Sequence, residues 1–95
     1  MIIAIDYDGT YSAAPELWDQ FIKLFQDAGH TLICCTGRTE DLGKPVMSSV
    51  GKLIPVVFAG GMSKREACKR HGYDVNVWID DMPEMITSSY LVVKV

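Results

Sequence analysis

The chain alternates short apolar runs with segments of helical periodicity, and this alternation limits the possible folds more than any other feature of the sequence. A run that is apolar throughout is typical of a strand buried on both faces. Strands that alternate with helices pair in parallel, with helices packed on both faces of the sheet. The pattern therefore predicts an α/β fold, a Rossmann-like three-layer sandwich around a mostly parallel five-stranded sheet. The predicted strands are residues 2–5, 31–35, 55–58, 75–79 and 91–95.

Helix signals fill the segments between these strands. A first helix begins near Pro15 and ends at Gly29, since proline suits a first helical turn and glycine suits the residue after the last one. The mixed pattern of residues 40–50 predicts a second helix, and residues 64–71 predict a third. The apolar residues at helical spacing in the first helix are Leu17, Phe21, Leu24, Phe25 and Ala28.

The size of the chain allows one domain, which we assign to residues 1–95. Hydrophobic residues make up 48% of the sequence and charged residues 22%, a balance typical of a packed core rather than a disordered segment. Neither an internal repeat nor a low-complexity linker divides the sequence.

The apolar runs and the cysteines predict the cellular location of the protein. Each run has about five residues, far short of the ~20 that cross a bilayer, and Met1 leads directly into the first strand without a signal-peptide pattern. The cysteines show neither a zinc spacing nor a disulfide framework. We therefore expect a cytoplasmic protein without a membrane partner, in which Cys34 and Cys35 are small buried hydrophobes and Cys68 stands alone.

Polar side chains directly follow three of the predicted strands: Asp6, Thr36 and Asp80. In open parallel sheets, ligands bind beyond the carboxyl ends of the strands. Three independent strand ends with reactive side chains are difficult to explain by packing alone. The sequence therefore predicts a functional site at this edge of the sheet.

The residue types at this edge suit phosphoryl transfer. A strand-end carboxylate such as Asp6 can attack phosphorus when a cation screens the two negative charges. A second carboxyl group two residues later, Asp8, can protonate the leaving oxygen and then deprotonate water. The pair Asp80 and Asp81 can complete the oxygen shell that Mg²⁺ prefers, while Thr36 and a lysine can donate to the phosphoryl oxygens.

These residues resemble the four motifs of the haloacid dehalogenase (HAD) superfamily, and the resemblance runs through nearly the whole chain. Residues 6–10 read Asp-Tyr-Asp-Gly-Thr after an apolar strand, and Thr36 follows the next strand. Lys64 stands at the start of the helix before the fourth strand, and the acidic pair at residues 80–81 follows that strand. One motif alone is moderately specific, whereas all four in order form a strong signal.

The resemblance implies a role for each of these residues. Asp6 would be the nucleophile and a metal ligand, and Asp8 would be the acid/base and would give its backbone carbonyl to Mg²⁺. Asp81 would contact the metal, with Asp80 as its supporting neighbour, although the reverse assignment stays open. Thr36 and Lys64 would stabilise the phosphoryl group, with Lys69 as the competing lysine. The expected substrate-binding residues are Gly9, Thr10, Gly37 and Arg38.

Two further features narrow the expected reaction. Residues 11–14 are all that separates the first motif from the first helix, and residues 39–63 are used by a helix and a strand, so neither place holds a cap domain. An open site has few side chains with which to select a small substrate or exclude water. Asp8 also matters, because family members that cleave carbon–halogen bonds lack its equivalent. The expected activity is Mg²⁺-dependent hydrolysis of a phosphate monoester, either a small molecule or an accessible terminal phosphate of a macromolecule.

Other functions are compatible with parts of the pattern. A catalytically weak HAD-like binding or regulatory protein would fit the small size of the chain. A two-component receiver domain is excluded, because its acceptor aspartate ends the third strand and residues 55–58 contain no acid. Nucleic acid is a possible partner, although a stripe of basic and aromatic residues does not indicate it. The sequence does not predict the ester or the oligomeric state.

Overall fold

The computed structural model describes residues 1–89 and has an α/β fold around a four-stranded sheet in which every pair is parallel. The strand order is β3-β2-β1-β4. The predicted parallel sheet is thus confirmed for four strands, and the fifth predicted strand, residues 91–95, lies outside the described residues. The strands are β1 (Ile2–Ile5), β2 (Thr31–Thr36), β3 (Val56–Phe58) and β4 (Val77–Ile79).

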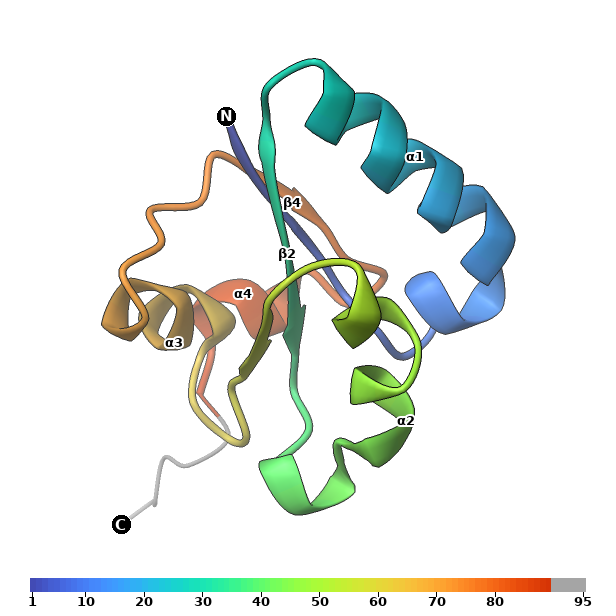
Figure 1. The fold of residues 1–95 in the computed structure, drawn as a ribbon. Helices are drawn as coiled ribbons and strands as arrows, with labels where there is room; N and C mark the ends of the chain where they lie inside the picture. The colour runs from blue at the N-terminus through green and yellow to red at the C-terminus, as the bar shows by residue number, and fades with distance from the viewer. Residues whose placement is uncertain (90–95) are drawn as a thin grey trace, which may run out of the picture.

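Successive side chains of the strands face opposite sides of the sheet, and each side has its own core. Ile3 and Ile5 of β1 pack with Ile22 of α1, whereas Ala4 of β1 packs with Ala67 of α3. Helices therefore cover both faces, as Figure 1 shows. The helices are α1 (Pro15–Asp27), α2 (Lys44–Met47), α3 (Lys64–Arg70) and α4 (Glu84–Thr87).

The prediction of one helix over residues 40–50 is wrong. The segment forms three short turns instead: η2 (Glu40–Leu42), α2 and η3 (Val50–Lys52). Pro45 has no amide hydrogen and suits only a first helical turn, so α2 begins at Lys44 instead of continuing from η2. At the other end, the Ser49 hydroxyl donates to the Pro45 carbonyl oxygen at 2.6 Å, which gives the backbone an alternative to further helix.

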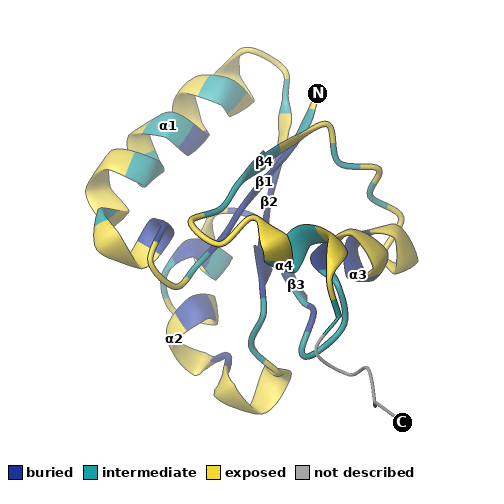
Figure 2. Cartoon of the chain, turned by 180° about the vertical axis from the view of Figure 1, so that it is seen from behind, coloured by how far each residue is buried: buried dark blue, intermediate teal, exposed yellow. Residues whose placement is uncertain are grey.

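The first helix has nearly the predicted bounds, but not all of its regularly spaced apolar residues pack against the core. Ile22 is buried, while Leu17 and Leu24 are 63% and 65% exposed. In Figure 2 much of α1 is coloured as exposed, and Leu17 and Leu24 line a hollow together with Ile79 of β4. α1 therefore keeps an uncovered apolar surface within the part of the chain that the structure describes.

The register brings the strand ends level with one another at one edge of the sheet. Ile5 is opposite both Cys34 of β2 and Ile79 of β4. The backbone amide of Asp6 then donates to the Ile79 carbonyl oxygen at 2.9 Å. The residues that follow β1 and β4 are consequently held side by side.

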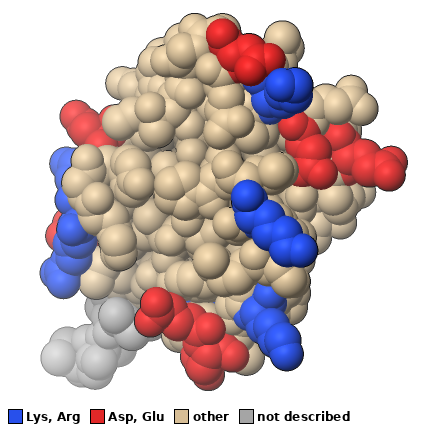
Figure 3. All heavy atoms as spheres, in the orientation of Figure 1, with Lys and Arg blue, Asp and Glu red and all other residues tan. Residues whose placement is uncertain are grey.

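The positions at which a cap domain would be inserted hold short local structure. η1 (Tyr11–Ala13) connects the first strand end to α1, and residues 39–62 form the short turns and β3. Over residues 1–89, no helix is long and apolar enough to cross a membrane. Figure 3 shows one face of the molecule, where most charged side chains lie toward the periphery of an uncharged surface.

Candidate active site

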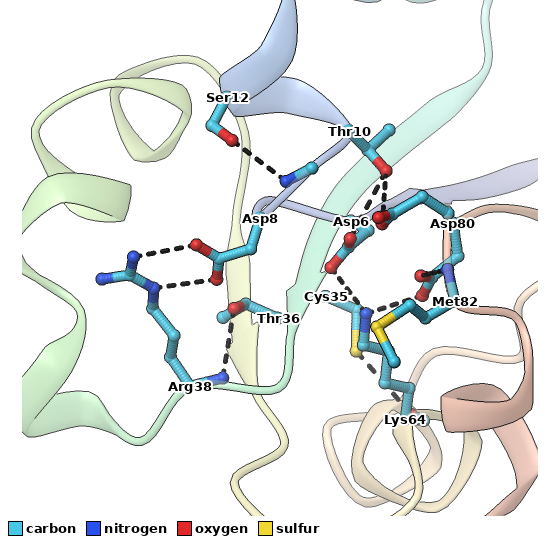
Figure 4. Close-up of polar contacts among 12 residues, drawn as sticks. Asp6, Asp8, Thr10, Ser12, Cys35, Thr36, Arg38, Lys64, Asp80 and Met82 are labelled. Atoms are coloured by element: carbon cyan, nitrogen blue, oxygen red, sulfur yellow. Dashed lines mark hydrogen bonds and ion pairs between the residues drawn. The ribbon is translucent and has the colours of Figure 1, made fainter.

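Asp6 lies at the end of β1 with only 7% of its surface exposed. One carboxylate oxygen, Oδ1, accepts a hydrogen bond from Lys64 Nζ at 2.6 Å, and the other accepts one from the Thr10 hydroxyl at 3.4 Å. Figure 4 shows the Asp6 carboxylate turned toward these two residues. The predicted nucleophile therefore lies in a polar pocket at the sheet edge.

Lys64 is the first residue of α3, and its side chain is 1% exposed. Its Nζ contacts Asp6 and also Asp80 Oδ2, each at 2.6 Å. Ser63 caps the helix by accepting a hydrogen bond from the Glu66 amide, which fixes where Lys64 begins. Burial alone would lower the pKa of Lys64, but hydrogen bonds to the two aspartates outweigh it and raise the pKa. Lys69, the competing lysine, is exposed.

The two acids after β4 have different surroundings. Both carboxylate oxygens of Asp80 are engaged, one by Lys64 and the other by the Met82 backbone amide at 2.9 Å. Asp81 is more open, and its Oδ1 accepts a hydrogen bond from Thr10 at 3.1 Å. The second Asp81 oxygen is thus better placed to bind an external ligand than either oxygen of Asp80.

Burial raises the pKa of Asp6 to about 6. The hydrogen bond from Lys64 opposes this rise, while the neighbouring Asp81 adds to it. Burial is the main cause, and Lys64, which is shared between Asp6 and Asp80, only partly offsets it. A cation at this position would favour the ionised form of Asp6 that nucleophilic attack requires.

The three acids fit a hard divalent cation. Asp6, Asp80 and Asp81 each offer a carboxylate oxygen, and these oxygens lie within 4.8 Å of one another. An all-oxygen set with net negative charge suits Mg²⁺ or Ca²⁺ better than a softer metal. Asp8, which we also predicted as a metal ligand, does not belong to this group through its carboxylate.

Asp8 is instead paired with Arg38, the residue that follows Gly37 after β2. Both Asp8 oxygens accept from the guanidinium, from Nε and Nη2 at 2.9 Å each. The hydrogen bonds from Arg38 hold the pKa of Asp8 below its usual range. Arg38 also donates to the Leu42 carbonyl oxygen at 2.7 Å and lies 5.3 Å from the centre of the Tyr7 ring. In Figure 4 the Asp8 carboxylate is turned away from Asp6.

The other predicted residues line the same sheet edge. Thr36 is fully buried, and its hydroxyl oxygen accepts a hydrogen bond from the Arg38 amide at 3.2 Å. Gly37 lies so close to Met85 that an added Cβ would come within 2.8 Å of the Met85 Cε. Thr10 faces Asp6 and Asp81 rather than open solvent.

Gly9 is required at its position for two reasons. Its φ of 80° is in the left-handed region, and a Cβ there would overlap the Asp81 carboxylate. The Gly9 amide also donates to the Ser12 hydroxyl oxygen at 3.1 Å, which closes the turn. This turn brings Thr10 back over the end of β1.

Sequence reasoning missed the pairing of Arg38 with Asp8. The signal was the parallel register, because β1 and β2 are neighbours and opposite charges follow both strands by a few residues. The contact of Met82 with Asp80 was also missed. It depends on a backbone turn after β4, for which side-chain patterns give no signal.

Comparison of the chain with protein-family models, curated proteins and solved structures finds no match.

Proposed function

We propose that this protein is a Mg²⁺-dependent phosphomonoester hydrolase that forms a covalent phosphate intermediate on Asp6. The observation that supports this most strongly is the buried Lys64, whose Nζ lies 2.6 Å from both Asp6 and Asp80 at two adjacent strand ends. Burying charged groups is costly unless they are paired, and a buried lysine between two strand-end acids, with Asp81 beside them, is more typical of a functional site than of a core.

In the first proposed step, an Asp6 carboxylate oxygen attacks phosphorus and the bond from phosphorus to the ester oxygen breaks. The leaving oxygen takes a proton from Asp8, which leaves the free alcohol and an aspartyl phosphate. In the second step, water attacks phosphorus and gives one proton to Asp8. The bond from phosphorus to Asp6 then breaks, which releases inorganic phosphate and restores both carboxyl groups.

Thr36 and Lys64 have supporting roles in this proposal. Lys64 Nζ already donates to Asp6 at the sheet edge, and Thr36 lies at the end of the neighbouring strand β2; both would donate to the transferred phosphoryl oxygens. Bound Mg²⁺ would screen the charge between the phosphoryl group and Asp6. The residues that would hold it are Asp6, Asp81, the supporting Asp80 and the backbone carbonyl of Asp8.

Asp8 has to leave Arg38 before it can serve both steps. The pair is partly open to solvent, with 56% of the Asp8 side chain exposed, so breaking it costs only about 1 kcal/mol. Substrate phosphate offers Arg38 a replacement anion. The same pairing also favours the second candidate, a catalytically weak binding or regulatory protein in which Asp8 stays with Arg38.

We also propose that the chain belongs to the HAD superfamily. Its fold would then be a Rossmann-like sandwich with a fifth strand and without a cap domain. We propose a cytoplasmic setting, which the buried free thiols of Cys34, Cys35 and Cys68 support.

A panel of phosphate monoesters, assayed with Mg²⁺ and with excess chelator, tests this proposal. We expect Mg²⁺-dependent release of phosphate that Asp6→Asn abolishes. Activity that survives in chelator would contradict the metal requirement. Phosphate-ester binding without turnover by the wild type would favour the regulatory candidate.

A further inference from the structure

An apolar groove lies along α1 and reaches Ile79 at the end of β4. Its volume is about 400 Å³, and Gln20 is the one residue with a polar side chain among those that line it. Leu17 and Leu24 are 63% and 65% exposed there. The lining residues are Leu17, Trp18, Gln20, Phe21, Leu24 and Ile79.

This groove continues into the candidate active site. A second hollow of about 410 Å³ shares Leu17, Trp18 and Ile79 with the groove. Its other end is lined by polar residues of the site, including Thr10 and Asp81. An apolar surface thus leads directly to the group of acids.

Thr10 marks the place where the two regions meet. Its hydroxyl donates to Asp6 at 3.4 Å and to Asp81 at 3.1 Å, while the residue also lines the hollow beside Trp18. Thr10 therefore contacts the proposed nucleophile and lines the hollow that continues into the groove. On the other side of the site, Asp8 and Arg38 present charged groups.

We propose that this groove binds the apolar organic group of the substrate, so that the preferred substrate is a phosphate monoester of an aromatic or aliphatic alcohol. The inference rests on the proposed function and specifies its substrate class. In this proposal the ester group extends from a phosphoryl group at Asp6 past Thr10, and Asp8 turns to the ester oxygen once it leaves Arg38. The apolar end of the ester then displaces water from Leu17 and Trp18. Burial of apolar surface then contributes to binding where a capless site has few other contacts.

The described chain does not supply another occupant. Ser89, the last described residue, donates through its hydroxyl to the Gly61 carbonyl oxygen at 2.9 Å. Gly61 follows β3, which lies at the opposite edge of the sheet from β4. The described chain therefore ends away from the groove.

Matched esters provide the first test. Benzyl phosphate and octyl phosphate carry aromatic and aliphatic groups, while ethylene glycol monophosphate carries a polar one, and all three are esters of primary alcohols. We expect KM to be lowest for the apolar esters. The ratio between benzyl and octyl phosphate shows whether the groove prefers a ring or a chain, and equal KM values for all three esters would overturn the inference.

Variants of the groove provide the second test. Leu17→Ser should raise KM for the apolar esters roughly fivefold, with kcat and the polar ester unaffected, because a serine buries much less apolar surface. Leu53→Ser is the matched control, since Leu53 is 47% exposed and outside the groove. Equal effects of the two substitutions on every ester would contradict the inference.

Binding without turnover separates this inference from the proposed function. Phenethylphosphonate replaces the ester oxygen of benzyl phosphate by a methylene group and is not hydrolysed. We expect it to shift the methyl NMR signals of Leu17 and Leu24 but not that of Leu53. If these signals shift while no ester is hydrolysed, the groove assignment holds and the phosphatase proposal fails. If esters are hydrolysed and the signals stay unchanged, the groove assignment alone fails.

A second copy of the chain is the remaining competitor for the groove. Sedimentation measures directly whether the protein is a monomer or a dimer. A dimer that Leu24→Ser converts to a monomer without any change in KM would overturn the substrate role and identify the groove as a subunit interface. A monomer, or a dimer unaffected by Leu24→Ser, agrees with the inference.

Discussion

Arg38 holds both carboxylate oxygens of Asp8, through Nε and Nη2 at 2.9 Å each, and so keeps the proposed acid/base turned away from Asp6. The two residues come from loops after neighbouring strands β1 and β2. A bidentate pair of this kind fixes the direction of a side chain as well as its charge. In the proposed mechanism, proton transfer from Asp8 to the leaving oxygen therefore depends on how readily Arg38 releases Asp8.

Arg38→Ala should raise kcat for a small aryl phosphate by up to about fivefold, since an exposed pair is worth about 1 kcal/mol. KM should rise as well, because in the proposed mechanism the guanidinium that releases Asp8 binds the substrate phosphate instead. Arg70→Ala is a suitable control, as Arg70 forms only an exposed pair with Glu66. A tenfold fall in kcat would show that Arg38 places Asp8 productively.

Lys64→Met should abolish measurable turnover and destabilise the protein by about 3 kcal/mol, because it leaves Asp6 and Asp80 without their buried partner. Lys69→Met provides the control on the same helix, since Lys69 is exposed. Thermal unfolding and phosphate release measure the two effects. Equal stability and equal activity of the two variants would show that Lys64 has no role in the site.

The acidic pair should separate into a metal ligand and a structural residue. Asp81→Ala is expected to raise the Mg²⁺ concentration for half-maximal activity at least tenfold, with little change in stability. Asp80→Ala should lower the melting temperature more, because Asp80 is 3% exposed and bonded to Lys64 and the Met82 amide. If Asp80→Ala weakened the Mg²⁺ dependence more and Asp81→Ala lowered the melting temperature more, Asp80 would be the metal ligand and Asp81 the structural residue.

The raised pKa of Asp6 predicts how the stability of the metal-free protein depends on pH. The folded protein binds this proton up to a pH of about 6, whereas the unfolded chain loses it near 3.8. Stability should therefore fall as pH rises from about 4 to about 6, by roughly 1–3 kcal/mol. Asp6→Asn should flatten this part of the profile, while Asp74→Asn, at an exposed acid, should not. A stability that rises from about pH 4 to about pH 6 as Asp6 ionises would contradict a raised pKa of Asp6.

The fold and the site differ in how far the sequence predicts them. Apolar runs such as residues 2–5 predict β1 and its parallel partners because a strand buried on both faces needs apolar side chains throughout. Residues 40–50 were mispredicted because helical spacing is a weaker influence there than the local effects of Pro45 and Ser49. β4 begins at Val77 rather than Val75, since the Asn76 side chain accepts a hydrogen bond from the Ile2 amide.

Side-chain direction is the part of the site that the sequence does not predict. The strand ends predict that Asp6, Thr36 and Asp80 gather at one edge, and they do. Asp8 is only two residues from Asp6, yet its carboxylate faces Arg38, because a charge on a neighbouring loop determines its direction. Such a contact depends on the register between strands, which no local pattern contains.

Trapping the covalent intermediate tests the central claim most directly. A nitrophenyl phosphate needs no proton on its leaving group, so Asp8→Asn should still allow attack by Asp6. Hydrolysis of the intermediate should slow by roughly 10²–10⁴, as is typical when a general base is lost. Intact-protein mass spectrometry measures the phosphate that remains on the chain.

We expect Asp8→Asn to gain the mass of one phosphoryl group in the presence of Mg²⁺, with the modification mapped to Asp6. The double variant Asp6→Asn/Asp8→Asn should gain none. An active wild type whose Asp8→Asn variant shows neither a slower rate nor an adduct, or an adduct that persists without Asp6, would contradict the account.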